Sequence, residues 1–160
     1  MRIGVFSDTH GAAHEMRLAV RQMGRVDFVL HAGDYFSDGE CLAQLTGARA
    51  AAVVGNCDLR VDGPTERVLQ LAGRRILLTH GHLYRVKQDH EPLLRRGAQL
   101  DAKILVFGHT HRSEIRWEGE VLLFNPGSLY LPTDPHEASY GILELTPGDV
   151  KAQLRHLRYY

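Results

Sequence analysis

Five apolar segments of the chain end in polar residues of the types that bind metal ions. The segments read VFSDTH, LHAGD, VVGNCD, LLTHGH and VFGHTH, and their polar residues are Asp8, His10, Asp34, Asn56, Asp58, His80, His82, His109 and His111. Imidazole nitrogens and carboxylate oxygens together suit divalent ions of intermediate softness, and a carboxylate shared between two ions suits a pair of them. A closed structural zinc site is not expected, because such sites favour Cys-rich tetrahedra and this chain has two separated cysteines, Cys41 and Cys57.

Each of these residues has a plainer explanation when it is taken alone. An aspartate after a strand, such as Asp34, commonly caps a helix or forms a turn, and a single histidine such as His80 is commonly a hydrogen-bonded core residue. The coincidence at five strand ends favours one shared site, because functional sites of open α/β sheets form outside the carboxyl ends of the strands. Residues two apart on extended backbone point the same way, so Asp8-x-His10 and His109-x-His111 can each chelate one ion.

The first sixty residues alternate between buried strands and helices. We predict strands at 2–6, 27–34 and 51–55, and helices at 12–23 and 38–47. Nearly unbroken apolar strands in this order favour a parallel sheet that is covered on both faces.

The remaining residues show more hairpin signals and add a more antiparallel sheet. We predict two strands within 66–81 that turn at Ala72-Gly73, a helix within 86–99 that begins near Pro92 and ends at Gly97, a strand within 102–111, and hairpins turning at Glu118-Gly119 and Pro147-Gly148. The predicted fold is therefore α/β, a two-sheet β-sandwich of mixed sheets flanked by helices, formed as one domain over residues 1–160.

Composition excludes several functional classes. Lysine plus arginine equals aspartate plus glutamate at 19 each, so no overall positive charge would attract nucleic acid tightly or anionic lipid. No apolar run approaches the roughly 18 residues of a membrane span, and the start MRIGVFSDTH lacks a long apolar signal region. Two cysteines without C-x-x-C spacing fit a reducing compartment, so we expect a cytoplasmic protein without a membrane partner.

The ordered motifs D-x-H, G-D, G-N-x-D, H and G-H-x-H resemble those of the calcineurin-like metallophosphoesterases. The exact motif sequences are most similar to those of a small bacterial and archaeal branch of this family, the phosphodiesterases of the YfcE type. They read SDTHG, HAGD, GNCD, THGH, GHTH and NPGS. The resemblance extends from residue 3 to about residue 145 and implies the metallophosphoesterase fold.

This resemblance implies a centre of two divalent metal ions. If the ligands of the family are assigned to the matching motif positions of this chain, the first ion would be held by Asp8, His10, Asp34 and His111. The second would be held by Asp34, Asn56, His80 and His109. Manganese is the first choice, with iron, nickel, zinc and cobalt as alternatives that the same ligands bind. A hydroxide bridging the metals would attack the phosphorus of a small phosphoester.

Cys57 departs from the broad family pattern, in which a histidine at this position is thought to assist the leaving group. A thiol is protonated at pH 7 but donates weak hydrogen bonds, so Cys57 would be either a weak acid or a small space-filling residue; a nucleophilic role is disfavoured. His82 is a candidate substitute acid or phosphate contact, or a solvent-facing side chain. Asp58 and His31 are expected to orient neighbours, and NPGS at 125–128 to form a supporting turn.

The favoured function is a phosphodiesterase, because no arginine cluster near the strand ends would receive a dianionic monoester. A phosphomonoesterase, a nuclease on polymers and a non-catalytic scaffold similar to the metallophosphoesterase-like subunit of retromer are the alternatives. Zero net charge counts against the nuclease. Tyr84, Trp117 and Tyr130 could mediate homo-oligomerisation, and the remaining histidines, His14, His90, His136 and His156, are expected at the surface.

Overall fold

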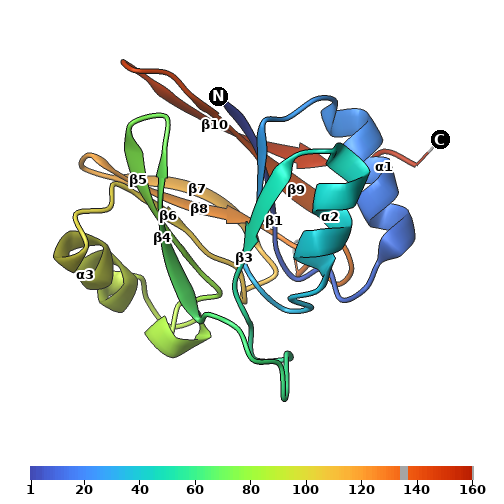
Figure 1. The fold of residues 1–160 in the computed structure, drawn as a ribbon. Helices are drawn as coiled ribbons and strands as arrows, with labels where there is room; N and C mark the ends of the chain where they lie inside the picture. Colours follow the sequence, from blue (N-terminus) through green and yellow to red (C-terminus); the bar gives the residue numbers. More distant parts are fainter. Residues whose placement is uncertain (134–136, 160) are drawn as a thin grey trace.

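The computed structural model describes residues 1–133 and 137–159 and folds them into two β-sheets with helices on the outside (Figure 1). The helices are α1 (Ala13–Met23), α2 (Asp38–Thr46) and α3 (Glu91–Gln99), with a short 3-10 turn, η1, at His82–Tyr84. The strands are β1 (Arg2–Phe6), β2 (Phe28–His31), β3 (Arg49–Ala52), β4 (Glu66–Leu71), β5 (Arg74–Thr79), β6 (Ile104–Val106), β7 (Ser113–Glu118), β8 (Val121–Pro126), β9 (Ser139–Leu145) and β10 (Val150–His156). None of the helices in these ranges combines the length and apolar character that a membrane span requires.

Both sheets are mixed, as predicted. The first has the strand order β10-β9-β1-β2-β3, in which β1, β2 and β3 are parallel and β9 and β10 are antiparallel additions. The second has the order β4-β5-β6-β8-β7, with parallel β5, β6 and β8 between two antiparallel edge strands. The expectation that the later strands add a more antiparallel sheet is wrong, because each sheet has two parallel and two antiparallel strand pairs. The last hairpin also lies elsewhere than expected, because β9 pairs with β1 and joins the first sheet.

Alternation along the strands builds three apolar layers. The layer between the sheets includes Ile3, Val5, Leu30, Leu78, Val106 and Phe124. Phe6 and Val29 face the other way and pack with Met16 of α1 and Leu42 of α2. Leu93 of α3 packs with Leu77, Leu105 and Leu123 on the outer face of the second sheet. Figure 1 accordingly shows α1 and α2 on one side of the sheets and α3 on the opposite side.

Element boundaries differ from the prediction at three places. The strand expected at 27–34 covers Phe28–His31, and the one expected at 51–55 covers Arg49–Ala52, so both stop before the polar residues that follow. The third helix does not end at Gly97 but continues to Gln99. Gly97 serves as a contact point there, because a Cβ on it would lie 2.7 Å from Leu105 Cδ2. The turns predicted at Ala72-Gly73, Glu118-Gly119 and Pro147-Gly148 are confirmed.

Gly141 of β9 lets the two sheets approach, and replacing it by alanine should destabilise the protein. A Cβ at this position would overlap the buried Phe124 ring of the second sheet and lie 3.2 Å from Val5 Cβ. We expect Gly141→Ala to lower the free energy of unfolding by about 1–3 kcal/mol, measured by urea denaturation. Gly148→Ala is the matched control, because nothing lies within 4 Å of its Cβ position, and its change should stay within about 0.5 kcal/mol. Equal stability of both variants would contradict the close contact.

Candidate metal centre

The loops that follow the parallel strands bring together four predicted metal ligands from separate parts of the chain. Asp8 and His10 follow β1, Asp34 follows β2, and His111 follows β6. Each offers one ligand atom, and these four atoms all lie within 4.8 Å of one another. We call these four residues the Asp–His cluster.

The pairs within the Asp–His cluster are close enough to share one ion. His10 Nε2 lies 3.6 Å from Asp34 Oδ2, and His111 Nε2 lies 3.0 Å from Asp8 Oδ1. The rings of His10 and His111 are 5.4 Å apart between centroids. Asp8 and Asp34 are 0% and 2% exposed, so both carboxylates lie inside the protein.

A second set of predicted ligands, Asn56, His80 and His109, adjoins this cluster, and we call it the Asn–His group. His80 Nε2 lies 3.0 Å from Asn56 Oδ1 and 3.4 Å from Asp34 Oδ1. The His109 ring is 5.1 Å from the His80 ring, and its backbone N–H donates to Asp8 Oδ2 at 3.0 Å. Asp34 therefore has Oδ2 near His10 and Oδ1 near His80, between the two sets.

The buried polar atoms of this region fit a cation. Within the described residues, Asp8 Oδ1 and His10 Nε2 are buried without a hydrogen-bond partner, which is costly in a protein interior. His80 Nδ1 donates to Ala32 O at 2.8 Å and His111 Nδ1 to Leu131 O at 2.7 Å, which directs Nε2 of each ring toward the site. These two Nε2 atoms face Asn56 Oδ1 and Asp8 Oδ1, and a cation held between each nitrogen and its oxygen would be bound by both.

The surroundings favour neutral imidazole at His109 and ionised carboxylate at Asp8. Burial lowers the pKa of His109 to about 4. Burial alone would raise the pKa of Asp8, but the close contact with His111, whose Nε2 lies 3.0 Å from Oδ1, and the charge of His80 outweigh it, so the pKa lies below its usual value. The same Asp8 carboxylate raises the pKa of His111. Deprotonated ligands are the forms that metal ions bind.

The backbone at the ligands is left-handed, a conformation that non-glycine residues rarely adopt. The φ angles are 51° at Asp8, 46° at His10, 57° at Asp34, 67° at His109 and 57° at His111. Surrounding hydrogen bonds hold these turns: Ser128 Oγ donates to Asp8 O at 2.7 Å, and Asn125 Nδ2 donates to Gly108 O at 3.0 Å. Several strained residues close together are typical of a functional site. Asn125 and Ser128 of the NPGS motif support this site through the two hydrogen bonds.

Two glycines make room for the carboxylates. A Cβ on Gly55 would overlap Asp34 Oδ1 and lie 2.5 Å from the Asp34 backbone nitrogen. A Cβ on Gly108 would overlap Ser7 Oγ and lie 2.6 Å from Asp8 Oδ2. The glycines that precede Asn56 and His109 in the GNCD and GHTH motifs are therefore needed for the close approach of neighbouring loops.

Asp58 and His31 lie behind the ligands, where they position the loops. Asp58 accepts backbone hydrogen bonds from Phe36 at 2.8 Å and Gly55 at 2.7 Å. His31 Nδ1 accepts from Gly33 N–H, so Nε2 donates to Thr9 Oγ1 at 2.8 Å, and Thr9 in turn donates to Asp38. Burial lowers the pKa of His31 to about 4, which keeps the ring neutral in this chain of hydrogen bonds.

Sequence reasoning missed Thr9 and Asp38 as parts of this arrangement. Asp38 was expected only as the first residue of a helix, but its buried carboxylate accepts hydrogen bonds from Thr9 Oγ1 and from the Gly11 backbone. Two aromatic rings beside His10 were also missed: Tyr35 lies 5.3 Å and Tyr130 5.9 Å from it between centroids. Tyr35 comes directly after the HAGD motif and Tyr130 two residues after NPGS, and these positions were the available signal.

Cys57 and His82 both lie beside the Asn–His group. Partial burial, followed by the hydrogen bond and charge of Asp34, raises the pKa of the exposed Cys57 to about 11, so its thiol is protonated at pH 7. The His82 ring is 5.3 Å from the His80 ring, and its buried Nδ1 has no hydrogen-bond partner within the described part of the chain. Burial lowers the pKa of His82.

The expected surface residues are only partly at the surface. His14 and His156 are exposed, but His90 is half-buried, packs edge-on against Phe107 and lies 3.4 Å from Glu114. His136 lies outside the described residues. Trp117 and Tyr130 are exposed, whereas Tyr84 packs beside α3 and donates to Glu66.

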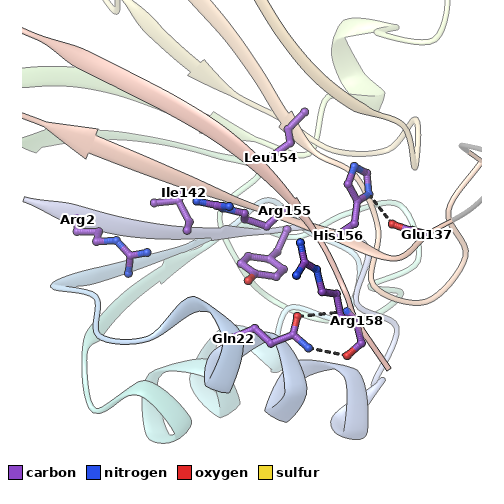
Figure 2. Close-up of a pocket in the computed structure, with 9 residues that line it drawn as sticks. Arg2, Gln22, Glu137, Ile142, Leu154, Arg155, His156 and Arg158 are labelled. Atoms are coloured by element: carbon purple, nitrogen blue, oxygen red, sulfur yellow. Dashed lines mark hydrogen bonds and ion pairs between the residues drawn. The ribbon is translucent and has the colours of Figure 1, made fainter. Parts of the chain in front are cut away.

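Arginines gather in a separate pocket of about 690 Å³ (Figure 2). Arg2, Arg155 and Arg158 line it together with Gln22 of α1, and none of the predicted ligands contributes to its wall. Arg2 already donates to two backbone carbonyls, and Gln22 exchanges hydrogen bonds with the Arg158 backbone. This pocket is therefore not part of the candidate metal centre.

Comparison with known proteins identifies the family. A model of the calcineurin-like phosphoesterase superfamily domain matches residues 1–148. Probable metallophosphoesterase YsnB of Bacillus subtilis (strain 168) is 36% identical over 147 residues, which cover 91% of this chain and 85% of that protein. Phosphodiesterase YfcE of Escherichia coli (strain K12) is 32% identical over 169 residues, which cover 90% of this chain and 88% of that protein.

A solved structure agrees with the fold. The crystal structure of a conserved protein from Streptococcus pneumoniae TIGR4, described as a predicted phosphoesterase, has a TM-score of 0.75 at 29% identity. The superposition covers 96% of this chain and 97% of the other. The family that the motifs resemble is thus confirmed by sequence and by fold, and the buried Asp–His cluster fits the metal site typical of it. The chain belongs to the calcineurin-like phosphoesterase superfamily.

Proposed function

We propose that this protein hydrolyses a small phosphodiester with two divalent metal ions, for which manganese is our first choice. One ion would be held by Asp8, His10, Asp34 and His111, and the other by Asp34, Asn56, His80 and His109. The observation that carries the proposal is the position of Asp34, whose Oδ2 lies 3.6 Å from His10 Nε2 and whose Oδ1 lies 3.4 Å from His80 Nε2. A carboxylate placed in this way can serve two cations at once.

The chemistry would depend on charge and orientation. Bound ions would supply an ionised water near neutral pH and offset the negative charge of the phosphate. The carbonyls of Ala32 and Leu131 hold His80 and His111 with Nε2 directed at the site. Asn56 would add a neutral oxygen, which leaves more positive charge on its ion than a further carboxylate would.

A diester is favoured over a monoester because the additional negative charge of a monoester calls for further cationic groups. The three arginines of the Figure 2 pocket belong to a site that shares no residue with the predicted ligands. We assign His82 to phosphate contact or proton donation, because its ring lies beside two predicted ligands, 5.3 Å from the His80 ring and 6.1 Å from the His109 ring between centroids. Cys57, as a neutral thiol, would fill space and assist the leaving group weakly.

Asp34→Asn should abolish turnover without unfolding the protein. Asparagine keeps an oxygen that can accept the Cys57 backbone N–H, now 2.9 Å from Asp34 Oδ1, but it removes the shared negative charge. We expect kcat for bis(p-nitrophenyl) phosphate to fall about 1000-fold and the metal content per chain to drop. Asp62→Asn, an exposed carboxylate in the β3–β4 loop, is the control and should retain activity. Full activity of Asp34→Asn in metal-replete buffer would contradict the assignment.

Removal of metal should stop hydrolysis reversibly. In the proposed mechanism bound ions are needed to supply the ionised water that attacks phosphorus, so chelator-treated protein should be inactive. Adding manganese, iron, nickel, zinc or cobalt singly should restore turnover to different degrees, measured on a panel of chromogenic monoesters and diesters. Unchanged turnover after chelation would refute the metal mechanism, and no turnover with any ion would favour the scaffold alternative.

Cys57→Ala should hardly change kcat for a substrate with a good leaving group. The thiol is protonated at pH 7 and is a weak donor, so kcat for bis(p-nitrophenyl) phosphate should change by no more than about threefold. Circular dichroism checks the fold of the variant. A loss of a hundredfold or more would instead assign the thiol a direct part in the reaction.

A further inference from the structure

A small apolar pocket opens directly beside the candidate metal centre. Its volume is about 280 Å³, and its wall includes Tyr35, Phe36, Cys57, Leu59 and Val61. Pockets for drug-sized ligands start at about 300 Å³, so this one suits a fragment such as a single ring. It lies between the loop after β2 and the loop after β3.

Asp58 ties these two loops together. Its Oδ1 accepts from the Phe36 backbone at 2.8 Å and its Oδ2 from the Gly55 backbone at 2.7 Å. The Val61 N–H donates to the Asp58 carbonyl at 3.3 Å, which turns the chain back over the pocket. Both carboxylate oxygens are thus already engaged by backbone groups, and the pocket is formed before any ligand arrives.

The pocket and the candidate metal centre share residues. Cys57, which lines the pocket, donates its backbone N–H to Asp34 Oδ1 at 2.9 Å. Tyr35 follows Asp34 in the chain, and its ring lies 5.3 Å from the His10 ring. A phosphate held between the Asp–His cluster and the Asn–His group would therefore have one of its ester arms within reach of the pocket.

The wall of the pocket is mainly apolar, with Ser37 and Asp58 as its polar members, and it is exposed to solvent. Leu59 is 81% exposed, and Val61 and Tyr35 are each 44% exposed, so these side chains offer surface that a ligand could cover. Asp58 is the one charged residue of the wall, and its oxygens are occupied. The pocket therefore offers attraction to an uncharged apolar group and none to a second anion.

We propose that this pocket binds an aromatic ester arm of the phosphodiester, so that the substrate class is diesters carrying at least one uncharged planar ring. The inference rests on the proposed function, because it places the phosphate at the metal centre. Leu59 and Val61 would cover the ring from the β3 side, and Tyr35 and Phe36 from the β2 side.

The test compares two phosphinates that carry the single negative charge of a diester and differ in one arm. Binding of methyl(phenyl)phosphinate and dimethylphosphinate to the manganese-loaded protein is measured by titration calorimetry, which needs no turnover. We expect methyl(phenyl)phosphinate to bind about tenfold more tightly, from burial of the ring. In the double variant Leu59→Ser, Val61→Ser this preference should fall to about twofold or less, while the affinity for dimethylphosphinate stays unchanged.

Leu83→Ser is the matched control, because Leu83 is 60% exposed beside His82 and does not line the pocket; it should keep the full preference. If the double variant is poorly folded, the phenyl preference is measured in the single variant Leu59→Ser, which changes the most exposed side chain of the pocket. Equal affinities of the wild-type protein for both phosphinates, a preference that survives in the double variant, or no binding of methyl(phenyl)phosphinate would each overturn the proposal.

Two further outcomes separate the pocket from the proposed function and from other occupants. A phenyl preference that depends on Leu59 and Val61 in a protein without phosphoesterase turnover would support the pocket and refute the function. Turnover of diesters without a phenyl preference would support the proposed function and refute the pocket. Light scattering that shows a wild-type dimer and a monomeric double variant would assign these side chains to a second copy of the chain and overturn the ring-binding proposal.

Discussion

The burial of two carboxylates between the two sheets is the constraint on which the rest of this structure depends. Asp8 and Asp34 are almost fully buried, and an ionised carboxylate in a protein interior is unfavourable unless opposite charges and hydrogen bonds compensate it. Part of the compensation is internal: Asp8 Oδ2 accepts from Ser7 and from the His109 backbone, and Asp34 Oδ1 accepts from the Cys57 backbone. Asp8 Oδ1 stays without a hydrogen bond within the described residues, which is where a cation fits.

This compensation requires loops from both sheets to meet, and their backbone is shaped accordingly. Left-handed residues such as Asp8 and His109 end the strands abruptly and turn their side chains inward, and the sheet packing supplies the energy that holds them there. Gly55 and Gly108 remove the Cβ atoms that would otherwise lie on the carboxylates. The chain of hydrogen bonds from His31 through Thr9 to Asp38 fixes the first loop from behind. The side chains of the candidate metal centre are thus held in place by contacts within the protein itself.

The fold class and the four residues of the Asp–His cluster could be predicted because both rest on local signals. Apolar runs define strands, and the polar residues at their ends, such as Asp34 and His80, can be recognised in the sequence because they are of types that bind metal ions. Three features could not be predicted. The place of β9 beside β1 depends on a pairing of distant residues; the continuation of α3 through Gly97 depends on its contact with Leu105; and the part played by Asp38 depends on a loop that folds back on it. Each is a tertiary interaction that overrides the local preference.

The residue at position 57 connects the proposed chemistry with the proposed pocket. In the family pattern that the GNCD motif resembles, this place holds a histidine, which would bring a polar, titratable ring to the edge of the metal centre. Cys57 is small, and its raised pKa keeps it neutral, so the wall it shares with Leu59 and Val61 stays apolar. Compared with a site that has histidine at this position, the proposed site would have a weaker proton donor for the leaving group and more apolar surface beside the phosphate. A phenol is a suitable leaving group for such a site, because a phenolate departs with less protonation than an alkoxide. Its aromatic ring can also be bound by apolar contacts. The weak acid at Cys57 and the apolar pocket therefore favour the same kind of substrate.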